Sequence, residues 1–186
     1  PGCMLVFGSS TRSYRDLPIR FSEFGLVHRN ELSGVLSGMF RVRAFTQDDA
    51  HIFATEGQIE QEVAALIELT DVVFKTFGFE YYAELSTRPQ KFMGEVLAWD
   101  IAEKALKNSL EKAAVKYKIN KGDGAFYGPK IDFKVKDAIG RIWQLSTVQL
   151  DFQMPLRFGL QYEGADGKPH VPIVIHRAIY GSMERF

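Results

Sequence analysis

A run of alternating side chains from Arg41 to His51 constrains the fold of this chain more than any other feature of its sequence. Successive side chains of a strand point to opposite faces of a sheet, so the run predicts a strand with two different faces. One face is mainly small or apolar and consists of Val42, Ala44, Thr46, Asp48, Ala50 and Ile52. The other is mainly polar and consists of Arg41, Arg43, Phe45, Gln47, Asp49 and His51.

The polar face has two explanations, a solvated surface or a binding surface. Solvation accounts for the charged residues but explains poorly why Phe45 lies among them. The preceding residues 20–31 have the pattern of a second strand, and residues 33–38 contain two glycines and two serines, which is typical of a hairpin loop. Antiparallel pairing across this loop would place Arg29 and Glu31 on the same surface.

Two other stretches, residues 55–78 and 96–117, repeat apolar residues at helical spacing. Thr55 is a favourable N-cap for the first, and Gly78 is a favourable stop. We expect the apolar stripes of both helices to be core. Further strands are predicted at residues 79–86, 131–135, 141–151 and 171–176. Together these elements predict an α+β fold, an antiparallel sheet flanked by helices.

Composition narrows the classes of function. The 186 residues suffice for one domain with a sizeable core. Basic and acidic residues number 23 each, so the chain as a whole offers no broad positive surface for nucleic acid. The single cysteine, Cys3, excludes an internal disulfide and fits a reducing compartment. No apolar run reaches the roughly 18–20 residues of a membrane span, and no signal-peptide pattern opens the chain.

The polar face fits a nucleotide site. Arginine binds phosphate oxygens through a forked, permanently charged guanidinium, which suits Arg29 and Arg41 to phosphates. An aromatic ring beside them, Phe45, suits the face of a nucleobase. Neither a GxxxxGK[ST] run nor a GxGxxG run after a strand occurs, so the sequence does not indicate a P-loop or Rossmann mechanism.

Other polar positions carry weaker signals. His51 and His176 each end a predicted strand, and each alone is most simply a structural histidine. Two histidines do not complete a zinc site, which needs three protein ligands. Residues 124–130 contain two glycines and a proline, which a plain turn would explain. A further polar strand face is formed by Thr147, Gln149 and Asp151.

These residues occur in runs that resemble the class II aminoacyl-tRNA synthetases, in particular the threonine-specific family, over essentially the whole chain. The run His28-Arg29-Asn30-Glu31, the loop after it and residues 41–53 resemble motif 2 of that class. Residues 124–133 resemble the same family, as do Trp143-Gln144 and residues 147–152. Residues 176–186 resemble the start of motif 3.

The resemblance implies a threonine–tRNA ligase that activates threonine with ATP, forms threonyl-adenylate and transfers threonine to tRNA(Thr). Arg29 would hold the α-phosphate, Phe45 would stack on adenine and Glu31 would contact the adenine edge. Arg41 and Arg185 would grip the outer phosphates, which would carry Mg²⁺. The implied catalytic residues are Arg29, Arg185 and Lys130. The implied ATP-binding residues are Arg29, Glu31, Arg41, Phe45, Gln144, Thr147 and Arg185.

The resemblance also implies a catalytic zinc that binds the amino and hydroxyl groups of threonine, with His51 and His176 as two ligands. The third ligand of the family is a cysteine in a Cys-Pro-Gly-His run, which would fall one position before Pro1. Cys3 stands where that histidine is expected, and three steps along a strand would turn it to the other face, which argues against it as a replacement. The implied threonine-binding residues are Gln47, Asp49, Tyr127 and Gln149.

By this resemblance, residues 1–186 form a core fragment that runs from motif 2 to the start of motif 3. Motif 1, the editing domain and the anticodon-binding domain are absent, and both ends of the chain indicate a fragment. The full-length family implies a homodimer and a cytoplasmic or organellar protein without a membrane partner. Two alternatives stay open: a module that binds ATP and an amino acid without catalysis, and a related synthetase for serine or proline, against which Asp49, His51 and His176 argue.

Overall fold

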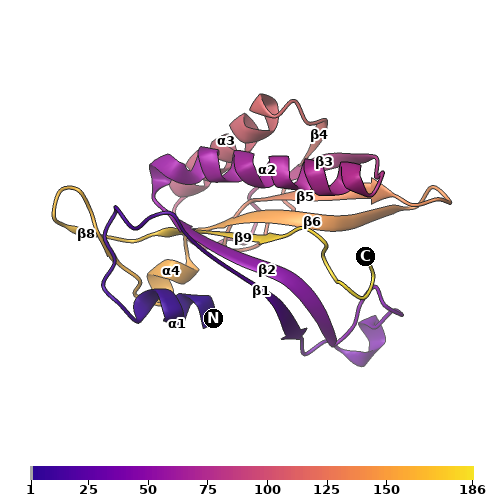
Figure 1. Ribbon diagram of the computed structural model, residues 1–186, viewed down its shortest axis with the longest axis horizontal. Helices are drawn as coiled ribbons and strands as arrows, with labels where there is room; N and C mark the ends of the chain where they lie inside the picture. Colours follow the sequence, from indigo (N-terminus) through magenta and orange to yellow (C-terminus); the bar gives the residue numbers. More distant parts are fainter. Residues whose placement is uncertain (1) are drawn as a thin grey trace.

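The computed structural model describes residues 2–186, in which a strongly curved sheet of seven strands is the main element (Figure 1). The strands follow the order β1-β2-β9-β6-β5-β3-β4, and every neighbouring pair is antiparallel except β3 with β4. The α+β fold class is therefore confirmed. The strands of this sheet are β1 (Ile19–His28), β2 (Ala44–Ala54), β3 (Tyr81–Ser86), β4 (Tyr117–Asn120), β5 (Lys130–Lys136), β6 (Ile142–Asp151) and β9 (Ile173–Ala178).

The expected hairpin of β1 and β2 is present, with a register that runs from Ile19 opposite Phe53 to His28 opposite Ala44. Both strands are shorter than predicted at the hairpin end. The loop between them contains a 3₁₀ turn, η1 (Ser33–Val35), and an isolated bridge that joins Ser37 to Arg41. This local pairing within the loop takes up the backbone groups that a longer ladder would use, so the loop spans residues 29–43.

The alternation of β2 is confirmed from Gln47 to Ile52, whereas Ala44 is exposed and Phe53 is fully buried. Residues 45, 47, 49 and 51 are all half-buried, whereas Asp48, Ala50 and Ile52 are buried beneath the helices. Asp48 is the exception to the apolar character of that face, because it is a buried carboxylate. Arg41 and Arg43 precede the strand, so their positions are set by the loop rather than by the strand.

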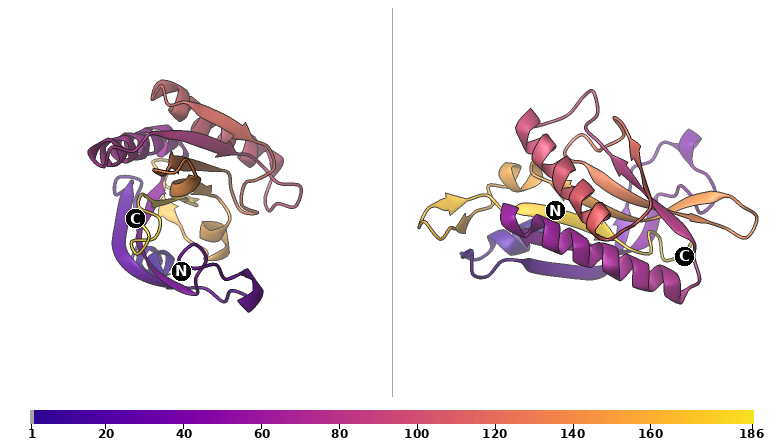
Figure 2. Two further views of the ribbon diagram at one scale, coloured as in Figure 1. Left: turned by 90° about the vertical axis from the view of Figure 1, so that its right-hand side faces the viewer. Right: turned by 90° about the horizontal axis from the view of Figure 1, so that it is seen from above.

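Two long helices, α2 (Ile59–Thr76) and α3 (Val96–Lys112), pack side by side and cover one face of the sheet (Figures 1 and 2). The first follows a 3₁₀ turn, η2 (Glu56–Gln58), and the Oε1 atom of Gln58 accepts a hydrogen bond from the backbone N–H of Thr55 at 2.9 Å. The stripes of both helices are core as expected, except at their C-terminal ends, where Phe77 and Ala113 are exposed. The buried members include Val63, Ile67, Phe74, Ala102, Leu106 and Leu110.

The second helix ends earlier than predicted. Residues 96–117 were expected to be helical, but α3 stops at Lys112 and Tyr117 begins β4, a strand that the sequence pattern did not indicate. Ala114 has a φ of 52°, in the left-handed region that a helix cannot continue through. The chain therefore reverses at Ala114, and β4 pairs parallel to β3 at the edge of the sheet.

A second, smaller core lies at the end of the sheet opposite the hairpin loop. It joins two helices that were not expected, α1 (Gly2–Gly8) and α4 (Met154–Arg157), to one end of β2 and β9. Phe7 stacks on Phe53 with ring centroids 4.4 Å apart. A short hairpin of β7 (Tyr162–Glu163) and β8 (Pro169–His170) lies at the same end. No helix in residues 2–186 has both the length and the apolar character to cross a membrane.

We expect the main core to tolerate truncation of a buried α3 side chain poorly. Leu106 is fully buried, so Leu106→Ala should lower the free energy of unfolding by about 2–5 kcal/mol. Leu97, on the same helix, is 70% exposed, so Leu97→Ala should change it by no more than about 0.5 kcal/mol. Urea unfolding of the two variants compares them directly, and equal losses would contradict the assignment of the buried face.

Candidate active site

The face of the sheet opposite α2 and α3 carries a cleft of about 310 Å³. It lies between the β1–β2 loop, β2, β6 and the segment that follows β9, and the end of that segment lies beside the loop (Figure 1). Its lining brings together every residue to which the sequence resemblance gave an ATP-binding role, and Gln47 as well. These residues are Arg29, Glu31, Arg41, Phe45, Gln144, Thr147 and Arg185.

Three guanidinium groups converge on this cleft. Cζ of Arg29 lies 4.8 Å from the centroid of the Phe45 ring, so the cation covers the face of that ring. Arg41 Nε donates to Oε2 of Glu31 at 3.1 Å. Arg185 Nη2 donates to the carbonyl oxygen of Gln144 at 2.7 Å, whereas its Nε is buried without a hydrogen-bond partner in residues 2–186. The cleft is thus positive although the chain as a whole has no net charge.

Arg185 reaches the cleft because two carboxylates, the buried Asp48 and the exposed Glu184, hold the segment that carries it. Asp48 is 4% exposed, and its side chain accepts hydrogen bonds from Nη1 of Arg177 and from the backbone N–H groups of Ile179 and Tyr180, at 2.8–3.0 Å. Further along, Oε1 of Glu184 accepts a hydrogen bond from the backbone N–H of Thr46 at 2.7 Å. This segment is therefore fastened to β2 at two points.

A bulge in β6 decides which side chains face the cleft. Gln144 and Thr147 are three residues apart, so a regular strand would turn them to opposite faces. The register between β5 and β6 shifts at this point, because Asp132 pairs with Thr147 while Lys134 pairs with Gln144. Two residues of β6 therefore lie opposite one residue of β5, and both polar side chains face the cleft.

Several of the residues predicted to bind threonine or its metal lie next to the cleft, along one row of cross-strand neighbours. His51 pairs with His176, His176 pairs with Gln149, and Gln149 pairs with Lys130. The two imidazole rings are 4.7 Å apart at their centroids. The hydroxyl of Tyr127 donates to Oε1 of Gln149 at 2.8 Å, and burial followed by the nearby charge of Asp151 raises the pKa of that hydroxyl, so it stays protonated.

The two histidines supply part of a metal-binding set. Nδ1 of His51 is buried without a hydrogen-bond partner in the described residues, and Oδ2 of Asp49 lies 3.7 Å from it. Burial, then the neighbouring His176, lowers the pKa of His51 to about 4, so the ring is neutral near pH 7, the form that binds metal. Nε2 of His176 lies 3.0 Å from the buried Asp151 carboxylate, an arrangement that leaves its Nδ1 as the free nitrogen.

A complete metal site is not formed by residues 2–186, because no group of three histidine, cysteine, aspartate or glutamate side chains there is placed to hold an ion. Cys3 lies in helix α1, not on the strand that the sequence suggested, and it packs against the smaller core. Burial, followed by the charges of Asp49 and Glu23, raises the pKa of its thiol. The histidine pair thus fits two of three zinc ligands, and the expected third position precedes Pro1, which lies outside the described residues.

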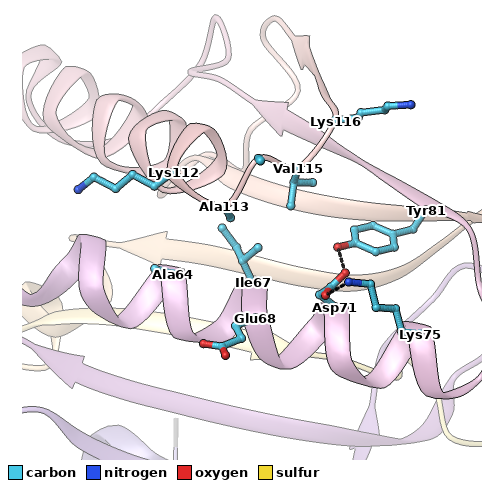
Figure 3. Close-up of a pocket in the computed structure, with 11 residues that line it drawn as sticks. Ala64, Ile67, Glu68, Asp71, Lys75, Tyr81, Lys112, Ala113, Val115 and Lys116 are labelled. Carbon is cyan, nitrogen blue, oxygen red and sulfur yellow. Dashed lines mark hydrogen bonds and ion pairs between the residues drawn. The ribbon is translucent and has the colours of Figure 1, made fainter.

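A larger hollow, of about 560 Å³, lies elsewhere, on the side of the sheet that the helices cover (Figure 3). It is lined by residues of α2 and by the turn after α3, and it contains no residue predicted to bind or react. Three of its polar groups pair with one another: Lys75 pairs with Asp71 at 2.6 Å, and the hydroxyl of Tyr81 donates to Asp71 at 2.8 Å. Nothing in this hollow is arranged as a reactive centre.

Several residues of the cleft were missed from the sequence. Asp132 contacts both Gln144 and Thr147, and its place in the alternating run Lys130, Asp132, Lys134 was the signal that could have singled it out. Phe40 stacks on Trp143 with centroids 4.2 Å apart and so joins the loop to β6. No local pattern indicates that contact, because the two residues are about a hundred positions apart.

Comparison with known proteins agrees with this geometry. The model of the family described as the tRNA synthetase class II core domain (G, H, P, S and T) matches residues 1–186. The chain is 61% identical over its whole length to threonine–tRNA ligases of Caldanaerobacter subterraneus subsp. tengcongensis and of Acetivibrio thermocellus. It covers 29% of the length of each of these two ligases.

A solved structure has the same fold. The crystal structure described as the RNA binding domain of threonyl-tRNA synthetase from Cryptosporidium parvum Iowa II superposes with a TM-score of 0.94 at 49% identity. The match covers all of this chain and 47% of that one. The chain therefore belongs to the class II tRNA synthetase core family and corresponds to a segment of a threonyl-tRNA synthetase.

Proposed function

We propose that the full-length protein containing this chain activates threonine with ATP and transfers it to tRNA(Thr). The observation that carries this proposal is the arrangement on one sheet face, where a cleft with three arginines and Phe45 adjoins the row that contains His51 and His176. The relatives named threonine–tRNA ligases support it. The chain itself is proposed as the stretch from motif 2 to the start of motif 3.

The length of β2 suits a substrate that carries a nucleobase at one end and an amino acid at the other. Alternate residues of a strand are roughly 6.6–6.8 Å apart, so the line from Phe45 to His51 extends over about 20 Å. Phe45 lies in the cleft with the arginines, and Asp49 and His51 lie at the histidine pair. Gln47 lies between them and lines the cleft. An extended aminoacyl-adenylate fits this line with its base at one end and its amino acid at the other.

In the proposed reaction, a carboxylate oxygen of threonine attacks the α-phosphorus of ATP, the bond to the β-phosphate oxygen breaks, and pyrophosphate leaves with that electron pair. A hydroxyl of the terminal ribose of tRNA then attacks the carbonyl carbon and displaces AMP. Arg29 would neutralise charge at the α-phosphate, and Arg41 and Arg185 at the outer phosphates, together with Mg²⁺. Catalysis then rests on positioning and on fixed positive charge.

At the amino-acid end, His51 and His176 would hold a zinc ion together with the cysteine that the family has at the position before Pro1. The zinc would bind the amino and hydroxyl groups of the substrate. Asp49 would accept a hydrogen bond from that hydroxyl, and Tyr127 would hold Gln149 against the amino acid. Such a site selects threonine over valine, because valine lacks the hydroxyl group and leaves polar groups unpaired.

Removing Arg29 should abolish activation. In the full-length protein, Arg29→Ala should lower threonine-dependent exchange of pyrophosphate into ATP by about 100-fold or more, because fixed charge at the reacting phosphate is lost. Arg15→Ala removes an exposed arginine that contacts Tyr14, away from the cleft, and should leave exchange unchanged. Unchanged exchange in the Arg29→Ala variant would refute the role of Arg29. A parent protein that binds ATP but shows no exchange would instead favour a binding module without catalysis.

Removal of zinc should weaken the selection of the amino acid and leave ATP binding unchanged. The metal-free full-length protein should still bind ATP, because the cleft contains none of the proposed metal ligands. Its preference for threonine over valine should fall from about 10⁴-fold toward the roughly 10²-fold that an apolar pocket gives between isosteres. Metal analysis with calorimetric titration of both amino acids measures this. A zinc-free protein that still selects threonine would contradict the assigned role of the histidines.

A further inference from the structure

We propose that Asp132 is a positioning residue for the nucleotide, which holds Gln144 and Thr147 in the orientation that the ATP cleft requires. Asp132 is 2% exposed, and it lies on β5, next to Gln144 and Thr147, which line the cleft. It would act through these side chains and not by touching the substrate. This inference deepens the proposed function and rests on it.

Three donors converge on the two carboxylate oxygens of Asp132. Nε2 of Gln144 and Oγ1 of Thr147 each donate to Oδ1 at 2.8 Å. Nζ of Lys130 donates to Oδ2 at 2.6 Å. Hydrogen bonds to a buried charge are short and strong, so a carboxylate with this set of partners restricts the rotamers of all three neighbours.

The bulge in β6 lies between Gln144 and Thr147, so that both side chains come within reach of the Asp132 carboxylate. Thr147 is the direct cross-strand partner of Asp132, and the register shift brings Gln144 to the same face two residues of β5 later. A regular ladder would leave Gln144 on the side of the helices. The shared acceptor is therefore part of what makes Gln144 and Thr147 one unit in the cleft.

The direction of these hydrogen bonds decides what the cleft offers to a ligand. Because the amide nitrogen of Gln144 is committed to Asp132, the Oε1 atom of Gln144 remains available as an acceptor. Because the hydroxyl hydrogen of Thr147 is also committed to Asp132, its oxygen lone pairs remain available. Both residues thus present acceptors, which suits ligand groups that donate, such as ribose hydroxyls or a base amino group.

Lys130 reduces the repulsion that the Asp132 carboxylate would exert on phosphates bound by the arginines of the cleft. A buried negative charge near a triphosphate would repel it, but the ammonium group of Lys130 lies 2.6 Å from Asp132 and balances that charge. The side chain of Lys130 is 21% exposed, so the pair is shielded from solvent. The carboxylate that orients the acceptors therefore has a counter-ion of its own.

Asp132→Asn tests the inference in the full-length protein. Asparagine has nearly the same volume, but one of its two oxygens becomes an NH₂ group, so it cannot accept from Lys130 and from the Gln144–Thr147 pair together. We expect the KM for ATP in threonine-dependent exchange to rise by roughly 10–100-fold, the range typical of residues that orient ligands. The KM for threonine should stay unchanged, because none of the proposed threonine-binding residues is hydrogen-bonded to Asp132.

A matched control separates positioning from stability. Glu62 is also a buried carboxylate, 3% exposed, and Arg20 donates to it at 2.6 and 2.8 Å on the side of the sheet that α2 covers. Glu62→Gln should lower the melting temperature and leave both KM values unchanged. If Asp132→Asn does not fold, Asp132→Ser, which keeps a small polar acceptor, replaces it with the same expected rise in the KM for ATP.

A double-mutant cycle tests whether Asp132 acts on the KM for ATP through Thr147. Thr147→Val should raise the KM for ATP less in Asp132→Asn than in the parent protein, because the hydroxyl is no longer oriented. An unchanged KM for ATP in a folded Asp132 variant, or additive effects in the cycle, would overturn the inference while the proposed function stands. A parent protein without threonine-dependent exchange would instead overturn the proposed function.

Discussion

The pairing of β9 between β2 and β6 is the constraint on which the rest of the structure depends. It places His51, His176 and Gln149 side by side, although they lie far apart in the chain. The same pairing directs the segment after β9 back toward the β1–β2 loop, where it closes the arginine-lined cleft. A slip of one residue in this register would turn these side chains toward the helices and remove both halves of the site.

Buried carboxylates give the polar face its order. Asp48 fastens the segment that carries Arg185, Asp132 joins Lys130 to the cleft, and Asp151 orients His176. Asp151 also accepts hydrogen bonds from the backbone N–H groups of Gln153 and Met154 and so begins α4. A buried charge that lost these partners would be costly, so each carboxylate favours one arrangement of its neighbours.

Charge is distributed unevenly over a chain that is neutral overall. The 23 basic and 23 acidic residues cancel in the sum, yet Arg29, Arg41 and Arg185 gather in one cleft. Within that cleft, Glu31 pairs with Arg41, and Phe45 lies beneath Arg29. A site of this kind attracts a polyanion locally and needs no positive surface elsewhere, so the balanced composition agrees with the proposed nucleotide ligand.

Local patterns determined much of this protein. The alternation of residues 41–51 specified the two faces of β2, the helical spacing specified α2 and the start of α3, and the family motifs named the residues that line the cleft. These features depend on neighbours in sequence, so they can be recognised before any fold is known. The grouping of Arg29 and Glu31 with Arg41 and Phe45 followed from the antiparallel hairpin, which the turn residues already indicated.

Tertiary structure alone decided the rest. The bulge of β6, the end of α3 at Ala114, the helix that contains Cys3 and the partners of Asp132 all depend on contacts between distant segments. Periodicity carries no information about such contacts, because a strand with or without a bulge has nearly the same residues. The sequence therefore determined most of the side chains that line the proposed site, and the pairing of the sheet decided how they are oriented, because orientation is set by hydrogen bonds between strands.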